Sequence, residues 1–114
     1  MSTMKNRVQL IGNLGQDPDV VKFEKGTTKA TFSLATNESY KNQGGEKVEQ
    51  VDWHQVVAWG HTAQFIEKYL AKGLKVGVEG KLSNRSFETK NGDRKYITEV
   101  IANEVVMLSP KKES

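Results

Sequence analysis

The sequence predicts an all-β domain with one helix, folded as a small closed barrel. Apolar and polar residues alternate over most of the 114-residue chain, and only one short stretch has the periodicity of a helix. A glycine interrupts the first alternating stretch, as the sharp bends of a closed barrel require. A chain of this length forms one domain and buries roughly two-thirds of its unfolded surface around a single core.

The first third of the chain is predicted to form two main strands and a short extended segment. Residues 7–14 alternate as a strand, with Gly12 at the predicted bend. After a turn, residues 19–24 continue in an extended conformation, and residues 27–37 alternate as a half-buried strand. The polar residues 38–50 are interpreted as a long hairpin loop.

The central strand, residues 51–61, carries both tryptophans of the chain. Trp53 and Trp59 have the same parity, so they project from one face of the strand, about 20 Å apart. His54 lies on the other face among smaller residues, and if this face points inward, the two indole rings point outward. Outward-facing rings on a basic sheet suit stacking on unpaired bases. In the alternative interpretation, both tryptophans belong to the core.

The single helical pattern covers residues 61–73. Thr62 is the expected N-cap and Gly73 the expected C-terminal stop. Phe65 and Tyr69 flank the apolar stripe and are expected to pack rather than to bind a ligand. The stripe itself consists of Ala63, Ile66 and Leu70.

The last two predicted strands, residues 76–87 and 95–108, form a hairpin. The Asn-Gly pair at 91–92 favours a type I′ turn, which needs positive φ angles. Residues 81–95 hold five basic and two acidic residues, an excess of +3 that equals the net charge of the whole chain. One face of the first strand carries two basic residues and an aromatic one: Lys81, Arg85 and Phe87.

The order of these elements, with the helix between the third and fourth main strands, is that of the five-stranded oligonucleotide-binding barrel, the OB-fold. This fold is a partly open Greek-key barrel that binds oligonucleotides on its surface. A compact β-sandwich is the alternative fold, but it leaves the single helix in the middle of the chain unexplained.

Composition excludes several classes of function. Cysteine is absent, so the chain has no disulfide, thiol nucleophile or cysteine metal site. His54 and His61 alone make a poor metal-ligand set, no phosphate-binding GxxxxGK[ST] loop is present, and no carboxylates are paired as acid and base. We therefore expect neither an enzyme nor a cofactor. The start of the chain lacks the pattern of a signal peptide, and no apolar run is long enough to span a bilayer, which predicts a cytoplasmic protein without a membrane partner.

Six motifs resemble, in order, those of the bacterial single-stranded DNA-binding protein family, over nearly all of that family's DNA-binding domain. They are VQLIGNLGQDPDV (8–20), SLATNESY (33–40), VDWHQVVAWG (51–60), AQFIEKYLAKG (63–73), VEGKL (78–82) and YITEV (96–100). The resemblance implies an OB-fold in residues 1–108. It also implies sequence-independent binding and protection of single-stranded DNA in replication, recombination and repair, by a homotetramer associated with the nucleoid.

The resemblance also implies roles for individual residues. Tyr40, Trp53, Trp59 and Phe87 take the family's base-stacking positions, with Tyr40 and Phe87 standing where tryptophan is often found and Trp59 where phenylalanine often is. His54 matches a position at the family's subunit interface. Any aromatic ring can stack on a base, and lysine and arginine neutralise phosphates. The expected phosphate contacts are Lys29, Lys41, Lys81, Arg85 and Arg94.

Residues 109–114 form a short charged end that is basic, whereas family members commonly continue through a flexible linker to an acidic tip that recruits replication and repair enzymes. Recruitment by that route is not expected for this chain. A tailless scaffold module of a replication-restart or mobile-element complex is therefore the alternative function. An RNA chaperone of the cold-shock type is a weaker alternative, because its barrels are shorter and lack the helix.

Overall fold

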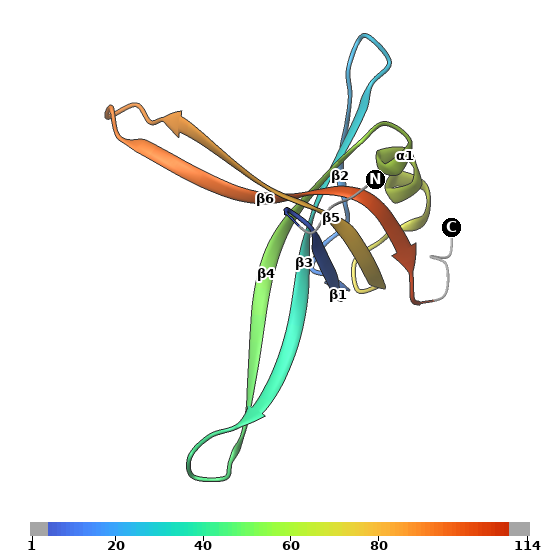
Figure 1. Cartoon of the computed structure of the whole chain (residues 1–114). Helices are drawn as coiled ribbons and strands as arrows, with labels where there is room; N and C mark the ends of the chain where they lie inside the picture. Colours follow the sequence, from blue (N-terminus) through green and yellow to red (C-terminus); the bar gives the residue numbers. More distant parts are fainter. Residues whose placement is uncertain (1–4, 110–114) are drawn as a thin grey trace.

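The computed structural model describes residues 5–109, which fold into six strands and one helix (Figure 1). The elements in chain order are β1 (Val8–Leu14), β2 (Asp19–Lys22), β3 (Thr28–Lys41), β4 (Lys47–Trp59), α1 (Gly60–Tyr69), β5 (Lys75–Glu88) and β6 (Arg94–Met107). The charged end predicted for residues 109–114 lies outside the described residues from position 110 onward. Within the described chain, no helix has the length and apolarity needed to cross a membrane.

Five of the strands close into a barrel, which confirms the predicted all-β fold class with a helix before the last two strands. The hydrogen-bonded order is β1-β5-β6-β4-β3-β2, and an additional pairing of β1 with β3 closes the ring. The pairing of β4 with β6 is parallel, and the other pairings are antiparallel. The short strand β2 pairs with β3 and lies outside the ring.

Closure of the barrel requires two glycines. A Cβ on Gly12 of β1 would overlap the backbone carbonyl of Ala35 on β3. A Cβ on Gly80 of β5 would overlap the carbonyl of Ile101 on β6, beside the register shift at Glu79/Gly80. The predicted importance of Gly12 therefore has a specific cause, because two strands cross there at a distance that leaves no room for a side chain.

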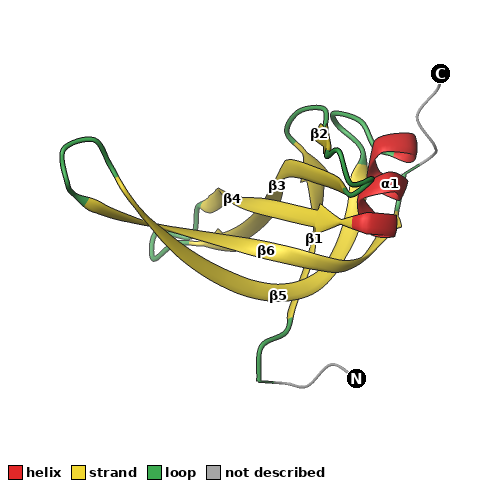
Figure 2. Cartoon of the chain, turned by 90° about the horizontal axis from the view of Figure 1, so that it is seen from above, coloured by secondary structure: helices red, strands yellow, loops and turns green. Residues whose placement is uncertain are grey.

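The core fills the barrel and extends under α1, which lies at one end of the barrel (Figure 2). Ala63 and Ile66 are the buried residues of the helix, and Phe65 packs against the core, as predicted. The Phe65 and Tyr69 rings lie 5.0 Å apart between centroids. The largest fully buried side chains are Phe32, Leu34, Val56, Ile66, Leu70 and Val76.

The predicted ends of the helix are wrong. The helix begins at Gly60 with Trp59 as N-cap, and among the described side chains none caps it, so Thr62 is not the cap. It ends at Tyr69 because Leu70 turns to an extended conformation and buries its side chain in the core. Gly73 has a φ of +88° but lies beyond the helix, where its N–H donates to the carbonyl of Leu14.

The predicted long loop at residues 38–50 is also wrong. β3 and β4 pair as far as Lys41 and Lys47, so this segment is a two-stranded arm projecting from the barrel (Figure 1). β5 and β6 form a second arm, paired as far as Glu88 and Arg94, that diverges from the first. Most of the outer part of both arms is exposed, so the alternation of apolar and polar residues that marks a half-buried strand is weak there.

The three hairpin turns in the described residues have the same hydrogen-bond pattern and backbone conformation. In each turn the glycine N–H donates to the carbonyl three residues earlier, and a second hydrogen bond closes the next residue pair; the turns begin at Phe23, Asn42 and Thr89. Gly26, Gly45 and Gly92 have φ values of +80° to +87°, whereas no non-glycine residue among positions 5–109 has a positive φ. This geometry is a type I turn followed by a left-handed glycine. The type I′ turn predicted at residues 91–92 is therefore wrong.

Candidate nucleic-acid interface

The outer face of β3 and β4 exposes the two tryptophans. Val56 and Ala58 point into the core and are fully buried, which turns the alternate residues of β4 outward. Trp53 is 62% exposed and Trp59 46% exposed. The alternative that both tryptophans belong to the core is wrong for this chain. We call the surface formed by the outward side chains of β3 and β4, and of residues 81–88 of β5 and 94–101 of β6, the tryptophan face.

Trp53 packs against two small residues, Ala35 and Gly15. Its partner across β3 is Ala35, and a Cβ on Gly15 would overlap the six-membered ring of Trp53. The indole thus rests on the turn after β1, where the Gly15 N–H donates to the carbonyl of Ser33 at 3.0 Å. One side of the ring is supported by backbone, and the exposed remainder can stack on a flat partner.

Trp59 stands at the other end of β4 in a cluster that the sequence analysis missed. Its ring stacks on Phe23, with centroids 6.0 Å apart and an interplanar angle of 19°. The Lys29 Nζ lies 5.4 Å from the centroid of the Trp59 ring, within the range of a cation–π contact. Phe23 is a lone aromatic residue in a polar turn, and this is the signal that could have identified it.

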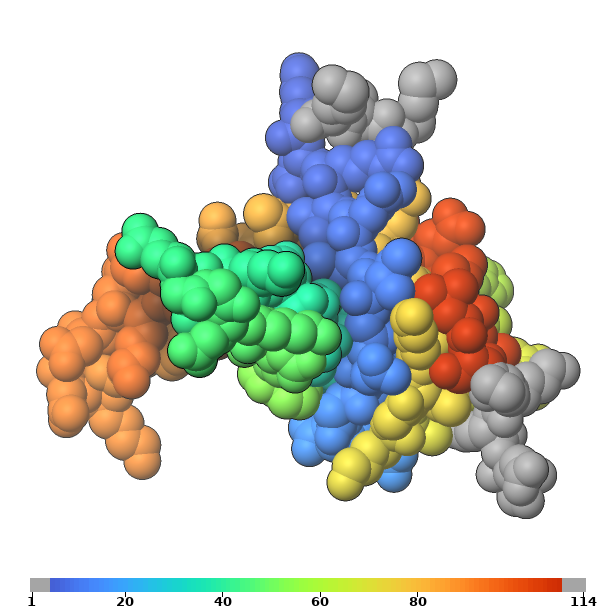
Figure 3. All heavy atoms as spheres, turned by 90° about the horizontal axis from the view of Figure 1, so that it is seen from below, coloured from blue at the N-terminus to red at the C-terminus, as the bar shows by residue number. Residues whose placement is uncertain are grey.

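The other two expected stacking residues lie on the arms. Phe87 is 43% exposed and has the outward parity of Lys81 and Arg85 on β5, so it belongs to the tryptophan face. Tyr40 is 52% exposed, but its parity on β3 is that of the inward residue Leu34. Tyr40 therefore projects from the opposite side of its arm, and the structure does not bring it onto one surface with the other three rings. In Figure 3, the view from below, the β3–β4 arm (green) lies in front and the β5–β6 arm (orange) projects to the left of the barrel.

The expected phosphate-binding residues also lie partly on the tryptophan face and partly on the reverse side of an arm. Lys29, Lys41 and Lys81 have outward parity on the tryptophan face. Arg94 lies on the reverse side of its arm, where Nη1 donates to the Ser86 hydroxyl at 3.1 Å and Nη2 lies 3.8 Å from a Glu88 carboxylate oxygen. This arginine is thus separated from the ring of Phe87 by the arm itself.

Arg85 is held by a buried acid. Its Nε donates to Glu99 Oε1 at 3.0 Å and its Nη2 to Oε2 at 3.5 Å. The Glu99 side chain is 10% exposed, whereas that of Arg85 is 58% exposed. Glu99 thus fixes one edge of the guanidinium and leaves the rest of the group open to solvent, where it can meet a phosphate.

His54, expected at a subunit interface, has a partner within the chain. Its Nε2 lies 3.0 Å from the Thr36 hydroxyl, and its residue pair across the sheet is Leu34. The imidazole is half-buried on the side opposite the tryptophans.

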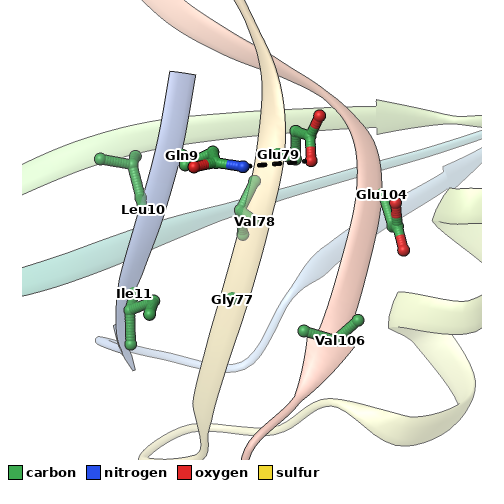
Figure 4. Close-up of a pocket in the computed structure, with 8 residues that line it drawn as sticks. All are labelled: Gln9, Leu10, Ile11, Gly77, Val78, Glu79, Glu104 and Val106. Atoms are coloured by element: carbon green, nitrogen blue, oxygen red, sulfur yellow. Dashed lines mark hydrogen bonds between the residues drawn. The ribbon is translucent and has the colours of Figure 1, made fainter. Parts of the chain in front are cut away.

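A hollow lies on the outer side of β1 and of the barrel parts of β5 and β6, away from the tryptophans. Its volume is about 270 Å³, and Ile11 and Val106 on its wall are 61% and 45% exposed (Figure 4). Gly77 leaves space between these two side chains. A hydrogen bond from Gln9 to Glu79 and an ion pair of Arg7 with Glu79 border the hollow.

A closed five-stranded barrel with one helix, exposed aromatic rings and lysines on one outer face defines a class of protein, the OB-fold binders of single-stranded nucleic acid. The family model described as "Single-strand binding protein family" matches residues 5–108. The chain belongs to this family of single-stranded DNA-binding proteins, which have no enzymatic activity. Membership confirms the resemblance found in the sequence and the exclusion of an enzyme.

Curated relatives are similar over most of this chain. The chain is 42% identical over 107 residues to "Single-stranded DNA-binding protein 1" of Chlorobaculum tepidum, covering 93% of this chain and 66% of that protein. It is 41% identical over 110 residues to the protein of the same name in Xylella fastidiosa, covering 96% and 81%. The chain therefore spans about two-thirds to four-fifths of the length of these relatives.

Solved structures agree with this assignment. The structure titled "Plasmodium falciparum SSB complex with ssDNA" superposes with a TM-score of 0.84 at 36% identity, covering 96% of this chain and 99% of that chain. A deletion mutant of the single-stranded DNA binding protein from Thermus aquaticus superposes with a TM-score of 0.80 at 30% identity, covering 91% and 50%. These likenesses confirm the OB-fold.

Proposed function

We propose that this chain binds single-stranded DNA without sequence preference through its tryptophan face, with residues 1–108 as the binding unit. The observation that carries the proposal is the exposure of Trp53 and Trp59, both about half or more accessible on one outer face of the barrel. Burying such rings against bases removes apolar surface from water and adds stacking. Duplex DNA hides its base faces inside the stack, so the unpaired strand is the preferred ligand.

Two interactions bind the strand: aromatic rings stack on bases, and basic side chains neutralise phosphates. Trp53, Trp59 and Phe87 take bases, each worth about 1 to 3 kcal/mol by alanine substitution in proteins of this kind. Tyr40 contributes from the reverse side of its arm, which requires the strand to pass around the arm. The phosphates are neutralised by Lys29, Lys41, Lys81 and Arg85, and by Arg94 where the strand passes behind its arm. Because neutralisation releases counterions, binding weakens as salt rises.

A homotetramer is the proposed assembly. The exposed side chains of Ile11 and Val106, with Leu108 at 50% exposure, form an apolar outer surface on β1, β5 and β6. Burial of this surface against another copy is favourable at about 25 cal/mol per Å² of apolar area. His54, on the side of the sheet away from the tryptophans, is proposed to lie at a contact between subunits. A tetramer lets one strand of DNA pass over several tryptophan faces.

The family setting suggests where this binding acts. We propose that the protein coats single-stranded DNA during replication, recombination and repair, in association with the nucleoid, in the cytoplasm where bacterial members of the family are generally found.

The test is a titration of intrinsic tryptophan fluorescence with oligo-dT and with a matched duplex, at low and high salt. The proposal expects strong quenching by oligo-dT that weakens with salt, and little response to the duplex. Trp53→Ala should weaken binding while the far-ultraviolet circular dichroism stays that of the folded barrel. Absence of quenching at low salt in a folded sample would contradict the proposal.

A further inference from the structure

We propose that Phe23 and Trp59 together form an additional nucleobase-binding site on the tryptophan face, at the end of β4 away from the β3–β4 arm. The inference rests on the proposed binding of single-stranded DNA and extends it to a residue outside the expected stacking set. The occupant is one base of the bound strand, placed against the Phe23–Trp59 pair and flanked by phosphates that lysines neutralise.

The β2–β3 hairpin brings the two rings together. Phe23 opens the hairpin turn, with its N–H donating to the Thr27 carbonyl at 2.9 Å, and this pairing directs the phenyl ring toward the end of β4. The rings of Phe23 and Trp59 are 19° from parallel with centroids 6.0 Å apart. The two rings are nearly parallel and stack on each other, and offset stacking is the geometry that aromatic groups prefer, so a base can extend this stack on an exposed ring face.

A hollow beside the pair has room for a base. Its volume is about 530 Å³, within the size range of ordinary small-ligand sites, and its exposed lining is mostly apolar. The lining consists of Phe23, Glu24, Lys25, Thr27 and Trp59. A flat apolar wall with polar groups at its rim matches a nucleobase, which has two π faces and a polar edge.

The exposure of the pair argues against a packing role. Phe23 is 45% exposed and Trp59 46% exposed, and neither ring is part of the barrel core or of the side chains packed against it. About half of each aromatic surface is left in water, which costs free energy in the unbound protein. A ligand that covers both rings recovers this energy.

The charges around the hollow favour a base inside it and phosphates beside it. Lys25 lines the hollow, and the Lys29 ammonium lies 5.4 Å from the Trp59 centroid. Glu24 also lines the hollow, and its carboxylate repels a phosphate there while it can accept hydrogen bonds from the amino groups of a base. Lys22, which precedes Phe23, is directed instead to Glu67 of α1, with Nζ 3.4 Å from the carboxylate.

The experiment uses the full chain carrying Trp53→Phe, which leaves Trp59 as the remaining tryptophan of the two. Binding of a labelled oligo-dT is followed by fluorescence anisotropy, and quenching of Trp59 is followed in the same titration. Phe23→Leu keeps the apolar bulk and removes the π surface, and Phe23→Tyr keeps the π surface. Val21→Ala is the matched control, because Val21 lies on the same hairpin and is 42% exposed.

We expect Phe23→Leu to weaken binding about five- to tenfold, the lower end of the range for one base–aromatic stack, and to reduce the quenching of Trp59. Phe23→Tyr and Val21→Ala should bind within about twofold of the parent. Equal affinity and equal quenching in Phe23→Leu would overturn the site and leave the proposed function standing. A parent that fails to bind oligo-dT would overturn both. A change of oligomeric state in Phe23→Leu by light scattering would assign the pair to a subunit contact and overturn the site.

Discussion

Removal of the Arg85 side chain should destabilise the barrel more than a surface substitution does, because it leaves the Glu99 carboxylate buried without its partner. At 3.0 Å and an effective dielectric constant of 20, the attraction of the pair is about 5.5 kcal/mol before desolvation is counted. The Glu99 side chain is 10% exposed, which approaches the case in which loss of a partner costs about 3 to 5 kcal/mol. Arg85 is 58% exposed, and water entering its place lowers the cost. We expect about 2 kcal/mol for Arg85→Ala.

The assay is urea denaturation of the wild type, Arg85→Ala, Glu99→Gln and the double variant. With a slope of about 1 to 3 kcal/mol per molar urea, a loss of about 2 kcal/mol lowers the midpoint by roughly 1 M. Glu99→Gln removes the buried charge, so the double variant should be more stable than the sum of the single losses predicts. Lys81→Ala, at an exposed position of the same strand face, is the control. Additive losses, or a cost below about 0.5 kcal/mol for Arg85→Ala, would refute the reasoning.

Three further predictions concern backbone contacts and assembly. Gly12→Ala should lower the free energy of unfolding by about 2 kcal/mol or more in thermal denaturation, because its Cβ would overlap the Ala35 carbonyl; an unchanged melting temperature would contradict this. Gly15→Ala should displace the Trp53 ring. We expect the tryptophan emission spectrum to shift and oligo-dT binding to weaken, while the circular dichroism spectrum stays that of the folded protein. An unshifted emission spectrum would argue against the contact. Ile11→Glu places a charge on the exposed apolar surface and should reduce the mass found by light scattering, and a mass equal to that of the wild type would exclude this surface from assembly.

The orientation of the tryptophans could be predicted from sequence because it depends on a local property. Residues two apart on a strand share a face, so the small residues Val56 and Ala58 sufficed to turn Trp53 and Trp59 outward once the strand was recognised. The order of the elements was equally accessible, since alternation, helical periodicity and turn glycines are all properties of short segments.

The arms and the side of Tyr40 were harder to predict for a physical reason. Much of residues 38–50 is exposed, so neither face of that ribbon selects apolar side chains, and the periodicity that marks a strand is lost. If the segment is not recognised as a strand, its register with β4 cannot be predicted. The sequence then does not say whether Tyr40 lies on the same side of the sheet as Trp53. The division of Arg85 and Arg94 between the two sides of their arm had another cause, because residue 94 fell between the predicted strands, where it had no parity, whereas β6 begins at Arg94.

Contacts between distant segments were not visible in the sequence at all. Phe23 and Trp59 are far apart in the chain and meet only because β2 and β4 pair on either side of β3. The ion pair of Arg85 and Glu99 depends likewise on the register of β5 and β6. Arg85 was therefore expected only as a phosphate contact, whereas the structure shows that it also pairs with the buried carboxylate of Glu99.

The closure of the barrel has a consequence for its motions. β1, β5 and β6 form one extensively paired half of the barrel, and β2, β3 and β4 form the other. The two halves meet at two seams, β1 with β3 and β4 with β6, and each seam has two registered residue pairs. These pairs are Asn13–Ala35 and Leu14–Leu34 at the first seam, and Val56–Val100 and Val57–Ile101 at the second. Narrow seams open at lower free energy than wide ladders, so amides that are hydrogen-bonded across a seam should exchange with deuterium before amides bonded within the β3–β4 and β5–β6 ladders. Each half carries one arm, and a strand of DNA bound to both arms bridges the seam between β4 and β6. Binding should therefore slow exchange of the amides bonded across the seam at Val56 and Val100 and make opening of this seam rarer.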